Sequence, residues 1–93
     1  MSGVQLGTGL GFVECIEPGG RSIFQLGDSY SEGTMAVTPE GHACFTYSSG
    51  VHCYRMQRVP KGYMVRGVGS RDAFHVRAVE RGVTRCTADD LIG

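Results

Sequence analysis

Two histidines and a cysteine stand close enough in the sequence to suggest a metal site. His42 and Cys44 are two residues apart, and His52 follows shortly after them. If the two segments are adjacent β-strands, His42 and Cys44 share a face and His52 lies diagonal to Cys44, which could suit zinc or copper. The spacing matches no recognised motif, and Cys53 would point to the other face. We therefore favour a partly exposed polar face and expect neither a metal nor a cofactor.

The same residues suggest nucleophilic chemistry. Cys44 beside His42 or His52 would supply a thiol and a base. Catalysis would also need a group that orients the base and an oxyanion site, and no Asp or Asn is placed to orient either histidine. We therefore expect a binding protein rather than an enzyme.

Arginine is the third candidate for chemistry, because eight of the nine basic residues are arginine. Residues 1–50 hold one base and five acids (net −4), whereas residues 51–93 hold eight bases and four acids (net +4). In a predicted hairpin Arg77 faces Arg85, an unfavourable pair unless an anion lies between them. The neutral total charge argues against nucleic acid as the main partner.

The elements that would position these residues are marked by three units that each end in glycine: TPEG at 38–41, YSSG at 47–50 and VPKG at 59–62. Each is typical of a type I turn closed by a left-handed glycine. Short runs rich in Val, Thr, Tyr, Phe and Met separate them, so residues 33–67 are predicted to form a four-stranded antiparallel meander with three-residue loops. The predicted flanking pairs are Thr38 with His42, Tyr47 with Val51, and Val59 with Tyr63.

This register places odd-numbered residues on a buried apolar face and even-numbered residues on an exposed mixed face. We expect Phe45, Tyr47 and Val51 to be buried, and Cys44 and Cys53 to lie on opposite faces without a disulfide between them. Arg55 and Gln57 break the apolar pattern, which suggests that the end of this strand bulges or overhangs the core. The predicted binding face carries His42, Cys44, Thr46, His52, Tyr54, Met56, Arg58, Met64 and Arg66.

Strand patterns also cover 10–16, 21–26 and 83–86, and for 71–81 a strand is favoured over a helix. Residues 1–9 read as a flexible N-terminus, 27–33 as a polar connection and 87–92 as a short helical turn. The sequence therefore predicts a single all-β domain over 1–93. About eight short strands would form a small antiparallel barrel or a two-sheet sandwich.

The function predicted from these features is that of a small non-enzymatic binding module. Its partner is expected to be protein, including a second copy of the chain, because Met, Tyr and Arg are common in interface cores. Small-ligand or single-stranded nucleic-acid binding through the barrel mouth or the Arg-rich C-terminal half, including Arg77 and Arg85, is the alternative. No long apolar run or signal pattern is present, so we expect a soluble, cytoplasmic protein with reduced cysteines and no membrane partner.

Overall fold

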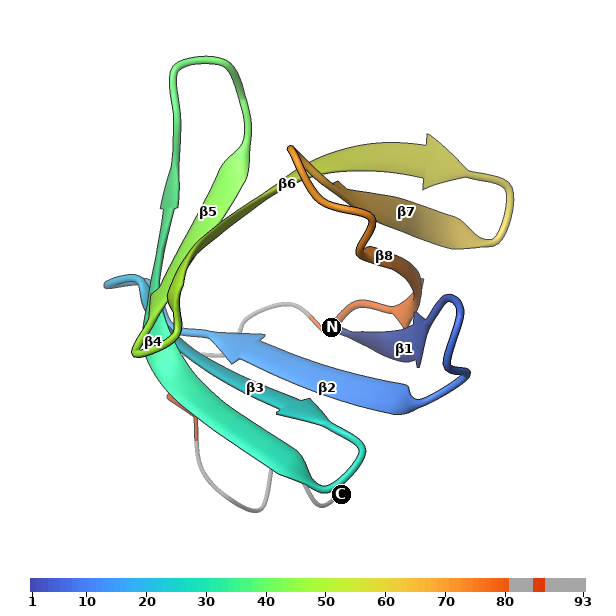
Figure 1. The fold of residues 1–93 in the computed structure, drawn as a ribbon, viewed down its shortest axis with the longest axis horizontal. Coiled ribbons are helices and arrows are strands. Elements are labelled where there is room, and N and C mark those ends of the chain that lie inside the picture. Colours follow the sequence, from blue (N-terminus) through green and yellow to red (C-terminus); the bar gives the residue numbers. More distant parts are fainter. Residues whose placement is uncertain (81–84, 87–93) are drawn as a thin grey trace.

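The computed structural model describes residues 1–80 and 85–86 of the chain. The strands follow one another as an antiparallel meander that closes into a barrel, with β8 hydrogen-bonded to β1 (Figure 1). The all-β prediction is thus confirmed, and of the two predicted architectures the chain adopts the barrel. The strands are β1 Ser2–Gln5, β2 Gly11–Ile16, β3 Arg21–Leu26, β4 Ser29–Val37, β5 Ala43–Tyr47, β6 Gly50–Val59, β7 Gly62–Gly67 and β8 Ala73–Ala78.

Closure of the barrel depends on β1, which lies within residues 1–9. The prediction that these residues form a flexible N-terminus is therefore wrong for Ser2–Gln5. β1 pairs with β2 on one side and with β8 on the other, where Gln5 lies opposite Phe74. Gly3 makes this approach possible, because a Cβ atom there would overlap the carbonyl oxygen of His75. The predicted strand over 71–81 is confirmed as β8. β8 is paired with β1 and β7, and residues 85–86 form no strand, so these two residues are not part of the return strand that was predicted. Residues 83–84 and the predicted helical turn at 87–92 lie outside the described residues.

Two long strands shape the barrel. β4 has 9 residues and β6 has 10, and each extends past one neighbouring strand at its start and past the other at its end. Figure 1 shows both strands bending, so that the outer part of the β4–β5 hairpin stands away from the rest of the barrel. The polar connection predicted at 27–33 is shorter than expected. It is only the turn between β3 and β4, because β4 already begins at Ser29.

The first two hairpins of the meander differ in loop length. Thr38 donates its backbone amide to the His42 carbonyl oxygen at 2.9 Å, so the first loop has the three residues that were predicted. In the second hairpin Gly50 itself pairs with Tyr47, which leaves a two-residue loop. The predicted pairing of Tyr47 with Val51 is therefore wrong by one residue.

The third hairpin repeats this slip, because Gly62 pairs with Val59 where Tyr63 was predicted. Glycine explains the difference, since it alone enters the mirror-image β region at large positive φ and can continue a ladder there. The backbone φ angles are 85° at Gly41, 130° at Gly50 and 119° at Gly62.

A one-residue slip moves every side chain of a strand to the opposite face. β6 is therefore reversed: Val51 points outward and is 64% exposed, whereas Tyr54 points into the barrel. The predicted burial of Val51 is wrong. Arg55 and Gln57 broke the predicted pattern because they lie on the outer face, and no bulge is needed to explain them. The second slip restores the predicted register in β7.

The reversed register joins two cysteines that were predicted to lie on opposite faces. Cys44 and Cys53 are directly opposite each other in β5 and β6, with Cα atoms 4.0 Å apart, and they form a disulfide. A second disulfide links Cys15 to Cys86. The expectation of reduced cysteines is therefore wrong.

Two apolar clusters form the core, one on each face of the sheet. Inside the barrel, Phe12, Phe74 and Val76 are buried together. Outside it, Cys15 and Ile23 pack with Cys86, which covers the outer face of β2 and β3. Among the described residues no helix is long and apolar enough to cross a membrane.

Candidate ligand-binding cavity

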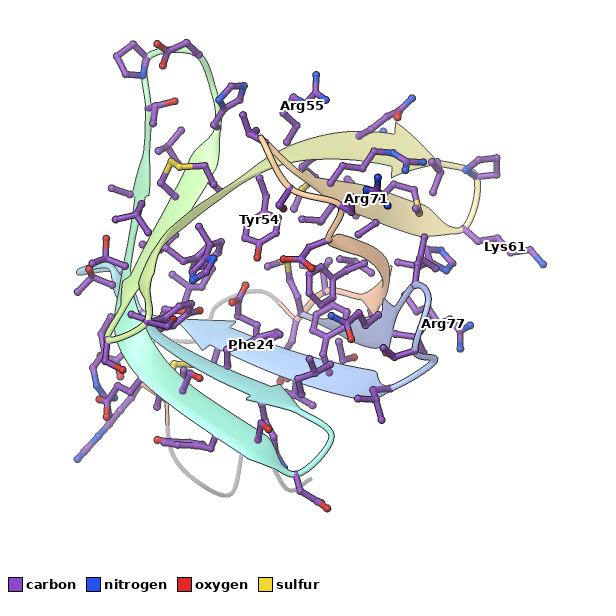
Figure 2. All side chains as sticks on the ribbon, in the orientation of Figure 1. Phe24, Tyr54, Arg55, Lys61, Arg71 and Arg77 are labelled. Carbon is purple, nitrogen blue, oxygen red and sulfur yellow. A yellow bond between two sulfur atoms is a disulfide. The ribbon has the colours of Figure 1, made fainter. Side chains whose placement is uncertain are left out.

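The barrel encloses a cavity of about 300 Å³. An eight-stranded barrel is just wide enough to be filled by side chains or to hold one small ligand. Figure 2 shows Phe24 of β3 and Tyr54 of β6 directed into this space from opposite sides. The lining residues are Met1, Phe12, Glu14, Ile16, Phe24, Met35, Ala43, Phe45, Tyr47, Tyr54, Arg55, Met56, Val65, Phe74 and Val76.

Aromatic rings form a continuous chain along this lining. The ring centroids of Phe24 and Phe74 lie 5.9 Å apart, and Tyr54 follows at 6.0 Å from Phe74. Phe45 is 5.9 Å from Tyr54, and Tyr47 is 6.2 Å from Phe45. Edge-to-face and stacked contacts of this kind hold aromatic rings in fixed orientations. The lining is therefore a rigid apolar surface.

One carboxyl group interrupts the apolar lining. Glu14 on the inner face of β2 is 8% exposed, and burial raises its pKa to about 7. The nearby Met1 ammonium opposes this rise, as does the Tyr47 hydroxyl, which donates a long hydrogen bond of 3.5 Å to Glu14 Oε2. The Met1 ammonium itself donates its 2.7 Å hydrogen bond to the backbone oxygen of Glu14. The carboxyl group is thus deeply buried and only weakly bonded.

Other polar groups surround Glu14. Burial raises the pKa of Tyr47 to about 12 and also raises that of Tyr54. The Ser22 hydroxyl of β3 is fully buried and lies near enough to Tyr47 to oppose the rise of its pKa. No hydrogen bond of ordinary length reaches this hydroxyl from the described residues. The cavity lining thus includes the Glu14 carboxyl and the Tyr47 and Tyr54 hydroxyls, whereas Ser22 is buried behind the lining.

The cavity reaches the surface beside the β4–β5 hairpin. Met56 and Arg55 of β6 line it although both are exposed, with Met56 at 51%. Met35 and Ala43 line the same side from β4 and β5. Figure 2 shows Arg55 at the edge between this hairpin and the β6–β7 hairpin. The mouth is therefore apolar with one arginine beside it.

The surface predicted from the sequence is divided by the register of β6. Tyr54 and Met56 line the cavity, and His52, opposite Phe45, lies on the same inner side of the sheet. Arg58 stands over the Tyr63 ring at 5.9 Å. The other predicted residues do not belong to β6, and they lie on the outer face of the sheet: His42, Cys44, Thr46, Met64 and Arg66.

The predicted metal ligands are separated in the same way. His52 lies on the inner side of the sheet, whereas Cys44 is on the outer face and is bound in a disulfide. Among residues 1–80 and 85–86, no group of three or more His, Cys, Asp or Glu side chains could hold a metal ion.

The predicted pairing of Arg77 with Arg85 is wrong, since both edges of β8 are occupied by β1 and β7. Arg85 lies near Glu17 instead, and its charge helps to lower the pKa of that carboxyl. A like-charged cross-strand pair does exist elsewhere, because Arg55 is directly opposite Arg66.

Comparison with known proteins adds no assignment: no family model, curated protein or solved structure matches this chain. The cavity residues that sequence reasoning missed are chiefly Phe12, Glu14 and Phe24. The available signal was the segment Phe12–Ile16, in which both alternating sets of positions are apolar except for Glu14. A strand that is apolar on both faces is covered on both faces, so a lone acid within it is buried.

Proposed function

We propose that this protein binds a small, mainly apolar ligand inside its barrel. The observation that carries the proposal is the cavity of about 300 Å³, which has an aromatic lining and a mouth between exposed side chains. This volume lies at the lower end of the range of small-molecule sites, which are mostly apolar with a few convergent polar groups. Small-ligand binding was the alternative in the sequence-based prediction, and the register of β6 favours it by turning Tyr54 and Met56 inward.

Filling the cavity tests this proposal. Ala43 lines the cavity from β5, so Ala43→Trp would occupy the space a ligand needs. Thr46 lies on the same strand but is exposed on the outer face, which makes Thr46→Trp a matched control. Fluorescence titration with the apolar probe 1-aminoanthracene should show saturable one-to-one binding to the natural protein and to Thr46→Trp. Ala43→Trp should weaken it at least tenfold, and equal affinities in the two variants would contradict the proposal.

Protein binding through the outer sheet face stays a prediction with less support. Five of the predicted residues share that face, but β6 contributes none of its predicted residues to it. The discriminating measurement is the solution mass by light scattering at two salt concentrations. A dimer that persists in moderate salt would favour protein association, whereas a monomer at both would favour the cavity.

We also infer that the protein functions in an oxidising compartment. Disulfides persist in such compartments and are rare in the cytosol, where thiols are kept reduced. All four cysteines are bridged. The prediction of a cytoplasmic location rested on the lack of a signal pattern and of a long apolar run, and the reduced cysteines that it implied are replaced by two disulfides. Rapid alkylation of the protein in freshly lysed cells should label no cysteine, and labelling of all four would favour the cytoplasm.

A further inference from the structure

The charged groups that line the cavity differ in how deeply they are buried. Glu14 is the sole acid among the lining residues, and it is buried. The lining cations are Arg55, which is exposed at the mouth, and the Met1 ammonium, which directs its hydrogen bond to a backbone oxygen. A ligand that enters the cavity therefore meets a negative group in its interior.

No side-chain cation within residues 1–80 and 85–86 forms an ion pair with Glu14. The ion pairs in the described part of the chain both belong to Arg21, which binds Glu17 and Glu32 on the outside of the barrel. A buried carboxylate without a paired cation is unfavourable, because the interior solvates it poorly. The Met1 ammonium acts on the charge of Glu14, but its hydrogen bond goes to the backbone oxygen and not to the carboxylate. A bound ammonium group would add the direct contact with the carboxylate that the described residues do not make.

The aromatic lining is suited to the same kind of ligand. The faces of aromatic rings carry partial negative charge and attract cations within about 6 Å of the ring centroid. Phe12, Phe24, Phe45, Tyr47, Tyr54 and Phe74 all line the cavity that contains Glu14. These rings and the carboxylate both favour a positive group and disfavour an anion.

We propose that the ligand is a hydrophobic amine, bound with its ammonium group against Glu14 and its apolar part among the aromatic rings. This inference rests on the proposed function, because it requires that the lumen is a ligand site. It assigns Glu14 as the residue that selects the ligand class. It also gives the Tyr47 hydroxyl oxygen, which lines the cavity beside Glu14, a role as a further acceptor for ammonium protons.

Binding of an amine should depend on pH in a defined direction. Glu14 has a pKa of about 7, and an alkylammonium remains charged until about pH 10, like lysine. The affinity should therefore rise about tenfold from pH 6 to pH 8, as the ionised fraction of Glu14 grows from about a tenth to about nine tenths. The groups that face Glu14 are the Met1 ammonium, Tyr47 and Tyr54; both tyrosines stay neutral over this range. Burial lowers the pKa of the Met1 ammonium below 8.0, so its loss of charge with rising pH acts in the same direction on the affinity for an amine.

Three ligands of similar shape separate the possibilities: 2-phenylethylamine, 2-phenylethanol and 3-phenylpropanoate. Calorimetric titration at pH 8 should give the tightest binding for the amine, at least tenfold weaker binding for the alcohol, and the weakest for the carboxylate. Glu14→Gln should bind amine and alcohol equally well and lose the pH dependence. Glu40→Gln, a change at an exposed turn residue that does not line the cavity, should behave like the natural protein.

The outcomes distinguish the inference that the ligand is an amine from the proposal that the barrel binds a small apolar ligand. If the alcohol binds but the amine binds no more tightly, the amine inference is overturned and the apolar-ligand proposal stands. If none of the three ligands binds, both fail. If Glu14→Gln does not fold, the ligand order and the pH dependence of the natural protein alone decide the matter.

Discussion

Strands β2 and β6 belong to the same closed sheet, yet their surroundings are nearly opposite. β2 is covered on both faces: Phe12 and Glu14 are buried in the lumen, and Cys15 is buried outside beneath Cys86. The second half of β6 is covered on neither face, because four consecutive residues, Arg55 to Arg58, are exposed. Closing a sheet removes its edges, but it does not cover its outer face.

Because β2 is covered and the second half of β6 is not, the two strands contribute to the cavity in different ways. The covered strand can hold a carboxyl group in an apolar interior, because Cys86 and the lumen side chains exclude water from both sides. The uncovered strand gives the cavity its mouth at Met56 and presents basic side chains to solvent. The comparison between β2 and β6 therefore predicts that changes at β2 alter stability more than matching changes at β6.

The largest effect is expected from removing the outer cover of β2. Replacing Cys15 and Cys86 by Ser opens a loop of 71 residues, which should cost about 4 kcal/mol of unfolding free energy through the entropy of the unfolded chain. Urea denaturation of the double variant measures this loss. A loss of less than about 1 kcal/mol would show that Cys86 does not hold the cover in place.

The inner face of β2 predicts a pH effect. The pKa of Glu14 is raised from 4.5 to about 7 in the folded protein, so the native state binds the extra proton between these values. The contribution of Glu14 to the unfolding free energy is then greatest below about pH 4.5. It decreases as the pH rises through 7, by about 3 kcal/mol in total. Urea denaturation at pH 5 and pH 8 should show most of this decrease, and Glu14→Gln should abolish it. If Glu40→Gln abolished it instead, Glu14 would not be its source.

A smaller loss is expected at β6. Replacing Cys44 and Cys53 by Ser opens a loop of only 9 residues, for which the same entropy relation gives about 2.6 kcal/mol. The disulfide lies on an uncovered face, so no buried cluster is exposed by its removal. If this double variant lost more stability in urea than the Cys15 and Cys86 variant, the ranking of the two strands would be reversed.

The smallest effect concerns the basic pair on the outside. Arg55 is opposite Arg66, so Arg55→Glu should replace a repulsive cross-strand pair with an attractive one and raise stability by about 0.2–1 kcal/mol. Gln57→Glu is the matched control, because its partner Met64 is uncharged. The gain should appear in the melting temperature at low salt and shrink as salt is added. An equal change in both variants would contradict the pairing.

Local patterns in the sequence predicted much of the sheet, but not the cavity. Glycine-closed turns located the hairpins, and alternation identified β8, because both signals depend on neighbouring residues. The loop length at Gly50 was not predictable from its motif, since TPEG and YSSG look alike but differ in whether the glycine joins the ladder. The charged and polar side chains of Arg55 and Gln57 were the available sign that β6 was reversed. Two slips in succession cancelled, so the faces of β7 were predicted correctly.

The cavity required information that no short segment contains. Its lining comes from strands throughout the chain, and the barrel exists only because β1 pairs with β8. Ser2 to Gln5 has no apolar alternation strong enough to identify a strand, so its partner could not be found from the sequence. The disulfide between Cys15 and Cys86 depends equally on distant contacts.

The pairing of β1 with β8 has a consequence for biosynthesis. During translation each hairpin from β2 to β7 can form as soon as its second strand leaves the ribosome, because its partner is adjacent in sequence. The pairing of β1 with β8 must wait until residue 78 has emerged, and Cys15 must wait for Cys86. Until then the nascent sheet has two free edges and an open apolar lumen, which are the surfaces through which unfinished chains aggregate. The growing chain of this barrel is therefore open to aggregation until β8 pairs with β1.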